Sequence, residues 1–196
     1  GLAKSLLKDP VSVDIEPQTT SADTVRQSVY LVDSARKLDL LAELVRQRNL
    51  HQVLVFTRTK LMAGRLASQL DRAGVEAISI HGDRSQPERE RALADFKSGA
   101  VRVLVATDVA ARGLDIDALP IVVNYELPHT AHDYVHRIGR TGRAGAVGAA
   151  ISLVAPEEED YLREVNRLLK RDLPVQVVKG FEPRLAVGPG TRPSSA

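Results

Sequence analysis

The sequence contains no cysteine, and this absence excludes two kinds of protein. Without cysteine there is neither a disulfide framework nor a thiolate metal site, which favours a reducing compartment such as the cytoplasm. Tryptophan is also absent and aromatic residues make up only 4%, so we expect no module that stacks bases on aromatic rings. No apolar run is long enough to span a bilayer and no signal peptide is evident, so we expect no membrane partner.

Charge of one sign is not in large excess either. The 27 Lys and Arg against 25 Asp and Glu leave a net charge of +2, which argues against a protein that simply coats nucleic acid. Arginine nevertheless outnumbers lysine by 20 to 7. Arginine binds phosphate oxygens two at a time, but a GC-rich genome would produce the same bias, so composition leaves both explanations open.

Composition divides the chain into three parts. Residues 1–24 contain Pro10, Pro17 and a polar run, which predicts an inter-domain linker. Residues 25–180 have the hydrophobic pattern of one domain, and residues 181–196 are predicted to form a flexible, truncated tail. The chain starts at Gly1 and its only methionine is Met62, so we expect it to be a piece of a longer protein.

Short apolar strands alternate with helices along residues 25–180. We expect strands at residues 29–32, 53–56, 77–80, 101–106, 121–125 and 149–154, with helices between them and after the last. Asp33 or Ser34 should cap the first helix, Ser85 and Glu88 have capping-box spacing, and Pro156 with the acids after it should open the last helix. This pattern predicts a three-layer α/β sandwich, with a mostly parallel central sheet covered by helices on both faces.

Polar residues follow three of the expected strands, at the edge where parallel sheets bind ligands. Hydroxyls, glycines and guanidiniums at this edge can hold phosphates without reading bases. The candidates in chain order are Thr57, Arg58, Gly82, Arg84, Gln86, Arg89, Thr107, Asp108, Arg112, Gly113 and Asp115. Taken singly, Thr57 could be only a cap, Asp108 the N-cap of a short helix and Arg89 a solvated charge, and these alternatives stay open.

A second set of candidates lies in residues 136–143, where three arginines and two glycines separate a helix from a strand. Arg140 and Arg143 are three residues apart, so on a helical turn they would point the same way. Two guanidiniums placed in this way suit one phosphate group, although a solvated basic turn is the alternative.

Two other interpretations of this region are weaker. The glycines at 139, 142, 145 and 148 resemble a dinucleotide-binding loop, but such a loop follows a strand and opens a helix, whereas here a strand follows. His129, His132 and His136 have a spacing that could bind zinc, but no further ligand is evident. We therefore predict no metal site.

Residues 103–116 followed by His136-Arg137-Ile138-Gly139-Arg140-Thr141-Gly142-Arg143 resemble the C-terminal RecA-like domain of DEAD-box RNA helicases. Residues 53–59 resemble the motif IV of this family, and residues 81–89 resemble its Gln-x-x-Arg element. The segments 124–128 and 180–183 are similar to the bacterial RhlE branch. The resemblance implies a RecA-like fold for residues 27 to about 181.

The resemblance also implies a role for each candidate residue. Arg140 and Arg143 would be arginine fingers on the γ-phosphate of ATP, and His136 would bridge to the N-terminal RecA-like domain of the same polypeptide. Asp115 would bind the ribose, and Gly113 would allow close approach of the nucleotide. The residues implied in holding the RNA backbone are Thr57, Arg58, Gly82, Arg84, Gln86, Arg89, Thr107, Asp108 and Arg112.

The parts of an ATPase that cradle the nucleotide are missing from these 196 residues. There is no Gly-Lys dipeptide for a Walker A loop and no Asp-Glu-Ala-Asp sequence, so ATP and Mg²⁺ would be held mainly by the missing N-terminal domain. We therefore expect an ATP-dependent RNA helicase as the full-length protein, and an isolated domain that is monomeric and inactive. The alternative function is a stand-alone, non-enzymatic RNA-binding or protein-docking module with this fold.

Overall fold

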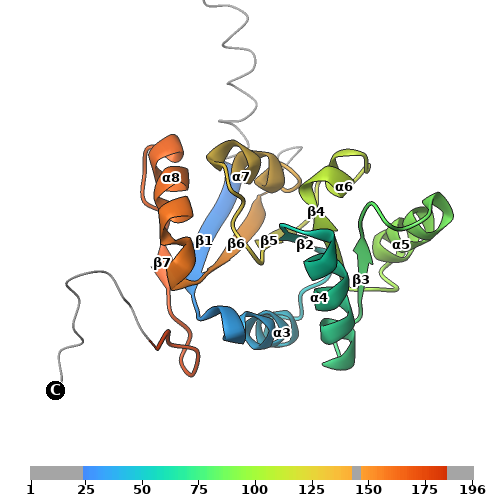
Figure 1. Cartoon of the computed structure of the whole chain (residues 1–196), viewed down its shortest axis with the longest axis horizontal. Coiled ribbons are helices and arrows are strands. Elements are labelled where there is room, and N and C mark those ends of the chain that lie inside the picture. The colour runs from blue at the N-terminus through green and yellow to red at the C-terminus, as the bar shows by residue number, and fades with distance from the viewer. Residues whose placement is uncertain (1–23, 143–146, 185–196) are drawn as a thin grey trace, which may run out of the picture.

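Seven strands form one sheet in the order β3-β4-β2-β5-β6-β1-β7, and every neighbouring pair is parallel (Figure 1). The computed structural model describes residues 24–142 and 147–184. Apolar residues fill most of the central strands, and β2 and β4 are buried along their whole length. The strands are β1 Val25–Leu31, β2 Val53–Thr57, β3 Ala77–Ile80, β4 Val103–Thr107, β5 Ile121–Asn124, β6 Gly148–Val154 and β7 Val175–Gln176.

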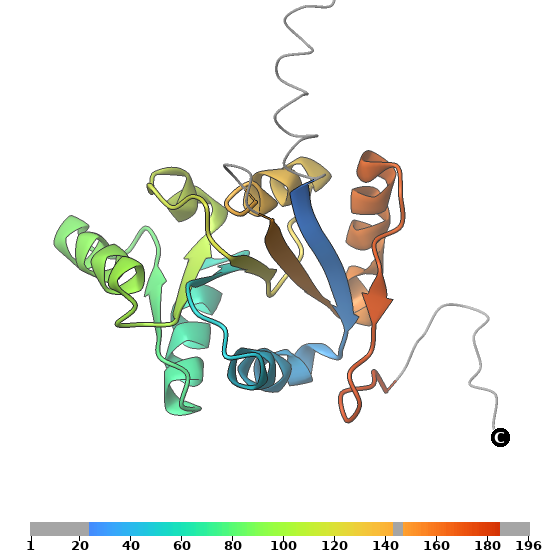
Figure 2. The same ribbon diagram turned by 180° about the vertical axis from the view of Figure 1, so that it is seen from behind.

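Helices cover both faces of this sheet (Figures 1 and 2). Successive strand residues point to opposite faces, so Val53 and Val55 pack with α3 and α4, whereas Leu54 and Phe56 pack with α5 and α6. On the second face, α7 and α8 pack over β1 and β6. The helical elements are η1 Ser34–Arg36, α3 Lys37–Gln47, α4 Lys60–Arg72, α5 Gln86–Ser98, α6 Asp108–Arg112, α7 Ala131–Ile138, η2 Pro156–Glu158 and α8 Glu159–Leu169. The three-layer fold predicted from the sequence is confirmed.

The starts of the helices nearest the strand ends are fixed by side-chain caps. Ser85 and Glu88 form the predicted capping box, in which the Ser85 hydroxyl accepts from the Glu88 N–H and the Glu88 carboxylate accepts from the Ser85 N–H. The hydroxyls of Thr59, Thr107 and Thr130 cap α4, α6 and α7. These caps set where each helix leaves the carboxyl edge of the sheet.

Some element boundaries differ from the sequence prediction. The first helix is preceded by the 3-10 turn η1, and Asp33 makes no side-chain cap there. Its carboxylate instead accepts a hydrogen bond from the Arg184 N–H at 3.0 Å. Strand β1 begins at Val25 because its pairing with β6 extends along seven residues, and β7 was not predicted at all because it is only two residues long.

The chain after β7 remains attached to the domain as far as it is described. Phe181 packs against the core beside α3, and the Arg36 guanidinium lies 4.6 Å from the centre of its ring. Residues 181–184 of the predicted tail therefore contact the domain, while the predicted linker, except Thr24, and residues 185–196 lie outside the described residues. Within the ranges described, no helix combines the length and apolar character needed to cross a membrane.

Candidate functional site

Four neighbouring strands bring most of the candidate residues to one edge of the sheet. Strands β3, β4, β2 and β5 are parallel and adjacent, and Thr57 stands directly opposite Thr107 at their carboxyl ends. The segments that begin at Arg58, His81, Asp108 and Tyr125 therefore leave the sheet side by side. The sequence predicted this juxtaposition from the strand pattern alone.

The loop between β3 and α5 and the first turn of α5 present exposed groups at this edge. Gly82 and Gln86 are exposed, and a methyl group added to Gly82 would meet nothing within 4 Å. Arg84 donates to the Ser79 hydroxyl at 2.9 Å. The Nε atoms of Arg84 and Arg89 are buried and have no hydrogen-bond partner among the residues described. Buried guanidinium donors without a partner are costly, so Arg84 in this loop and Arg89 in α5 have donors to offer an anionic ligand.

Two predicted contacts, Thr57 and Thr107, have their hydroxyls engaged within the domain. Thr57 is fully buried and donates to the Thr59 carbonyl at 3.2 Å. The Thr107 hydroxyl accepts from the Ala110 N–H and is the N-cap of α6. The alternative that Asp108 caps this helix is wrong, because Asp108 is its first residue and its carboxylate binds Arg137.

Arg137 is the residue that joins α7 to the strand ends, and sequence reasoning missed it. Its side chain is 1% exposed and holds the Asp108 carboxylate with two parallel bonds, at 2.7 Å from Nε and 2.8 Å from Nη2. Its Nη1 donates to Asn124 Oδ1 at 3.0 Å and to the Glu126 carbonyl at 2.7 Å. The signal was a charged residue at a buried position of α7, beside Tyr134 and Ile138.

Arg140 binds the segment that carries the predicted ribose contacts. Its guanidinium donates to the carbonyls of Ala111 at 2.9 Å and Leu114 at 3.2 Å, and it lies 3.8 Å from the Asp117 carboxylate. Gly113 and Asp115 are exposed on this same segment. Arg140 thus holds these two residues in place beside the end of α7. Arg143, the second predicted arginine finger, lies outside the described residues.

A small pocket opens between α6 and α7. Its lining includes Arg112, His136 and Arg140, with Asp108 and Arg137 beneath them. His136 is exposed, and Arg112 is 64% exposed and lies 3.5 Å from Asp133. Three cationic or hydrogen-bonding side chains around one opening suit a phosphate group better than an apolar ligand. No group of three His, Asp or Glu residues that could hold a metal occurs in the described part of the chain.

The turn after α7 is held by glycine packing. Gly142 has φ +69°, and a methyl group added there would come within 2.8 Å of the Val25 side chain. A methyl group on Gly148 would overlap the Thr141 hydroxyl and the Gly142 nitrogen. Thr141 is fully buried and donates to the Leu119 carbonyl. These glycines let β6 pack closely against the turn, and they do not form the dinucleotide loop considered as an alternative.

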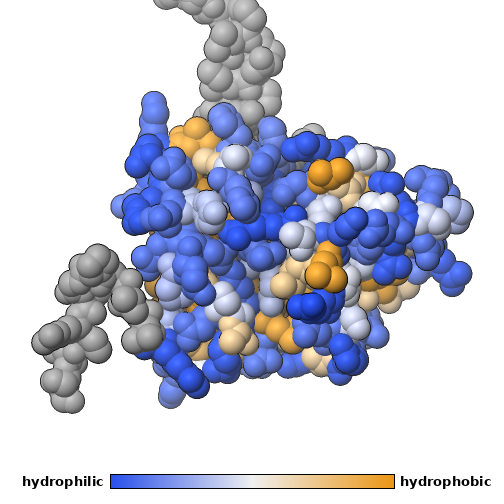
Figure 3. Space-filling view, in the orientation of Figure 1, coloured by the Kyte–Doolittle hydropathy of each residue, from blue (hydrophilic) through white to orange (hydrophobic). Residues whose placement is uncertain are grey.

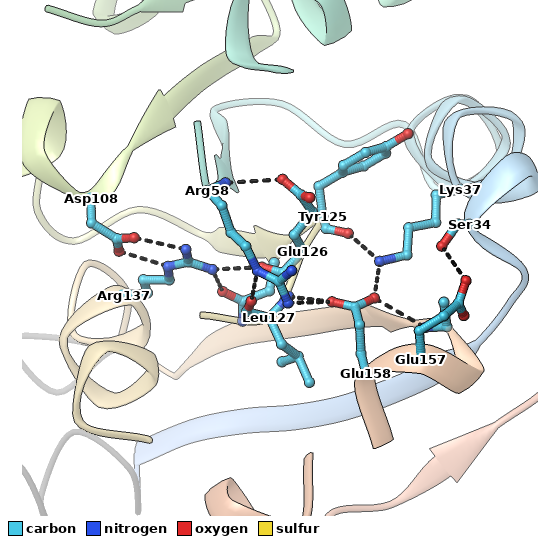
Figure 4. Close-up of polar contacts among 12 residues, drawn as sticks. Ser34, Lys37, Arg58, Asp108, Tyr125, Glu126, Leu127, Arg137, Glu157 and Glu158 are labelled. Atoms are coloured by element: carbon cyan, nitrogen blue, oxygen red, sulfur yellow. Dashed lines mark hydrogen bonds and ion pairs between the residues drawn. The ribbon is translucent and has the colours of Figure 1, made fainter. Parts of the chain in front are cut away.

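The loop from Tyr125 to Leu127 is held on its other side by a buried ion cluster (Figure 4). Lys37 Nζ donates to the Tyr125 carbonyl at 2.7 Å and forms an ion pair with Glu158. Glu158 accepts from the Leu127 N–H at 2.8 Å, and Arg58 donates to the Leu127 carbonyl at 2.7 Å and to Glu158 at 3.3 Å. Burial lowers the pKa of Lys37, and the nearby Glu158 opposes this shift.

The face of the domain seen in Figure 3 is mostly polar. Figure 3 shows a largely hydrophilic surface in the orientation of Figure 1, with separate apolar spots and no single broad apolar patch. Leu61 at the start of α4 and Val109 in α6 are among the exposed apolar side chains, at 70% and 77%.

The parallel sheet order, the polar strand ends and the arginine-bearing end of α7 define the class of the protein as a RecA-like α/β domain. The family described as "Helicase conserved C-terminal domain" matches residues 36–145. The chain belongs to this family and corresponds to the C-terminal domain of DEAD-box helicases.

Two curated relatives show how much of a longer protein the chain covers. It is 40% identical to the ATP-dependent RNA helicase SrmB of Haemophilus influenzae over 183 residues, which is 93% of this chain and 42% of the relative. It is 44% identical to the ATP-dependent RNA helicase RhlB of Pseudomonas aeruginosa over 172 residues, which is 88% of this chain and 43% of the relative. The chain thus spans less than half the length of these proteins. The resemblance to the RhlE branch in particular is not confirmed.

Solved structures support the same assignment. The chain is similar to E. coli DEAD-box protein SrmB bound to regulator of ribonuclease activity A, with a TM-score of 0.78, 36% identity, and coverage of 82% of this chain and 95% of the other. It is also similar to S. cerevisiae Dbp5 bound to RNA and ADP BeF3, with a TM-score of 0.70, 36% identity, and coverage of 80% and 42%.

Proposed function

We propose that this domain is the second RecA-like half of an ATP-dependent DEAD-box RNA helicase. The observation that carries the proposal is that Arg140 is hydrogen-bonded to the segment that contains Gly113 and Asp115. One residue expected at the γ-phosphate and two expected near the ribose belong to the same hydrogen-bonded unit. The relatives named as ATP-dependent RNA helicases, and the Dbp5 structure named with RNA and ADP BeF3, support this function.

In this proposal Arg140 and Arg143 stabilise the charge that develops on the transferred phosphoryl group. An arginine fork suits phosphate oxygens, and its charge is present at every working pH. His136 is exposed and lines the pocket with Arg140, and in this proposal it bridges to the N-terminal domain of the same polypeptide. In this proposal that domain supplies the Walker A loop and the Mg²⁺ ligands, as the resemblance to DEAD-box helicases implies.

The strand-end surface binds the RNA backbone without reading its bases. Gly82 gives the phosphate close access to the backbone, while Arg84 in the same loop and Gln86 and Arg89 in the first turn of α5 supply donors. Arg112 adds an exposed charge at the end of α6. The side chains of Thr57, Thr107 and Asp108 do not contact the RNA directly. Their polar atoms form hydrogen bonds within the domain and hold the loops that carry these contacts.

The test is the ATPase rate of the full-length protein with the single substitution Arg140→Lys. Lysine keeps the charge but loses the fork, so RNA-stimulated turnover should fall toward the roughly 10³-fold loss typical of a missing arginine finger. Because Arg140 also binds carbonyls of the domain, thermal melting must show that the variant is folded. Arg163→Lys, an exposed arginine of α8, is the matched control and should keep full turnover.

Near-normal turnover by a folded Arg140→Lys variant would reject the arginine-finger role. A full-length protein that binds RNA but never hydrolyses ATP would instead support the alternative, a non-enzymatic RNA-binding module. The sequence of the longer protein is an independent test of the enzyme against the non-enzymatic module. A phosphate loop and Asp-Glu-Ala-Asp in that sequence support the enzyme, and their absence supports the module.

A further inference from the structure

We propose that Arg58, Glu158 and Lys37 are positioning residues that hold the loop from Tyr125 to Leu127 and so couple RNA binding to ATP hydrolysis. The proposal rests on the helicase function above and assigns a role to three residues outside the nucleotide and strand contacts. It also changes the expected role of Arg58, which the strand-end pattern placed among the RNA contacts.

The surroundings of Arg58 show that its guanidinium is directed into the domain. Its Nε donates to the Leu127 carbonyl at 2.7 Å, and its Nη2 lies 3.3 Å from Glu158. The guanidinium also lies 4.9 Å from the centre of the Tyr161 ring, and the Arg58 N–H donates to Glu126 at 3.0 Å. The Leu127 carbonyl, the Glu158 carboxylate and the Tyr161 ring thus direct the guanidinium into the domain, so fewer of its N–H groups are free to bind a phosphate.

Glu158 is the centre of this cluster. Its side chain is 8% exposed and its two oxygens receive hydrogen bonds from groups far apart in sequence: Lys37, Arg58, and the N–H groups of Leu127 and Ala155. One carboxylate therefore joins the start of α3, the end of β2, the loop after β5 and the turn before α8 (Figure 4). Removal of its charge would leave two cations facing each other in a largely buried space.

The same loop is bound from the opposite side by Arg137. Its Nη1 donates to the Glu126 carbonyl at 2.7 Å, one residue before the carbonyl that accepts from Arg58. Arg137 in turn holds Asp108, at the start of the segment that Arg140 binds. A shift of this loop would therefore move Arg137, which lines the pocket with Arg140. It would also move Arg58, which lies just before α4.

The first experiment compares Glu158→Gln with Glu157→Gln in the full-length protein. Glu157 is the adjacent acid, is exposed, and accepts only from the Ser34 hydroxyl among its described hydrogen bonds, so it is a matched control. ATPase assays across a series of RNA concentrations give kcat and the KM for RNA. Glu158→Gln should lower RNA-stimulated kcat/KM by roughly tenfold while ATP turnover without RNA changes little, because the coupling is lost and not the pocket.

The second experiment separates positioning from phosphate contact at Arg58. Salt titrations of full-length protein with a fluorescent single strand give the slope of log K against log salt. Arg89→Met should make this slope shallower by about 0.7, the loss of one neutralised phosphate, whereas Arg58→Met should leave it unchanged and still lower RNA-stimulated kcat. Arg58 is partly exposed, so this variant carries the test even if Glu158→Gln does not fold.

Three results would overturn the inference. They are a slope change for Arg58→Met equal to that for Arg89→Met, unchanged kcat/KM in folded Glu158→Gln, or an equal loss in Glu157→Gln. Failure of the helicase function has a different signature: wild-type full-length protein would show no RNA-stimulated ATPase. The salt slopes would still decide in that case whether Arg58 contacts the strand.

Discussion

The carboxylate of Asp108 meets the guanidinium of Arg137 with both oxygens, and this pair ties the start of α6 to the last turn of α7. Arg137 is among the largest fully buried side chains described in the domain, although it carries a permanent charge. Asp108 and Arg137 line the same pocket as Arg112, His136 and Arg140. The geometry of the proposed phosphate pocket therefore depends on this ion pair.

We predict that Asp108→Ala destabilises the domain by about 3 kcal/mol, because it leaves a buried arginine without its charge partner. Chemical denaturation of the 196-residue chain measures this change. Asp160→Ala is the control, because Asp160 pairs with Arg163 on the exposed side of α8 and its loss should cost less than about 1 kcal/mol. Equal losses for the two variants would contradict the assigned role of the Asp108–Arg137 pair.

A second prediction concerns the packing of β6 against the turn after α7. Gly148→Ala places a methyl group on the Thr141 hydroxyl and the Gly142 backbone, and backbone cannot rotate away as a flexible side chain can. We expect a loss of stability of roughly 1–3 kcal/mol and a lower ATPase rate in the full-length protein, since Arg140 adjoins this turn. Gly113→Ala, with nothing within 4 Å, should leave stability unchanged in the same denaturation assay. The packing argument fails if both substitutions are tolerated equally.

The capping box of α5 leads to a pH prediction. The backbone N–H of Ser85, and next its hydroxyl interaction, hold the pKa of Glu88 below its usual 4.5. A carboxyl whose folded pKa is lowered stabilises the fold above its unfolded value, and this contribution disappears as pH falls through the folded pKa. Glu88→Gln should therefore reduce the loss of stability on acidification below about pH 4.5. NMR titration of the Glu88 carboxyl gives the pKa directly, and a value at or above 4.5 would refute the assignment.

Much of the fold was predictable because its signals are local. The buried strands and the Ser85 capping box can be read from a few adjacent residues, and parallel pairing then places the strand ends at one edge. Lys37, Arg137 and Glu158 were missed because their roles depend on distant partners. Lys37 and Arg137 are charged residues at buried positions of their helices, where periodicity predicts an apolar side chain.

Glu158 shows the limit most clearly. It belongs to a run of four acidic residues, and such a run after Pro156 predicts the start of a helix. It does accept from the Ala155 N–H, as a capping residue would, but it also binds Lys37, 121 positions earlier in the chain. Nothing in the run distinguishes Glu158 from its exposed neighbours Glu157 and Glu159, because only the packing of η2 against α3 selects it.

The last prediction is that the 196-residue chain binds single-stranded RNA weakly, with little sequence preference and a shallow salt dependence. With Arg58 engaged by Glu158, the cationic candidates at the strand ends are Arg84, Arg89 and Arg112. Two or three neutralised phosphates give a slope of log K against log salt of roughly −1.4 to −2.1 for a single strand. Backbone N–H groups near Gly82 add hydrogen bonds but release no counterions, and few aromatic residues are present to stack bases.

Salt titrations of fluorescent oligonucleotides of different sequence measure this slope and the sequence preference together. Arg89→Ala should weaken binding to every oligonucleotide and make the slope shallower by about 0.7, whereas Arg163→Ala on α8 should change neither. A slope steeper than about −5 would require more phosphate contacts than these arginines can make. Tight binding to one sequence only would require base contacts, and would contradict a surface that grips the backbone. Under the proposed function, ATP would close the N-terminal domain onto the same strand, so that two weak surfaces bind as one.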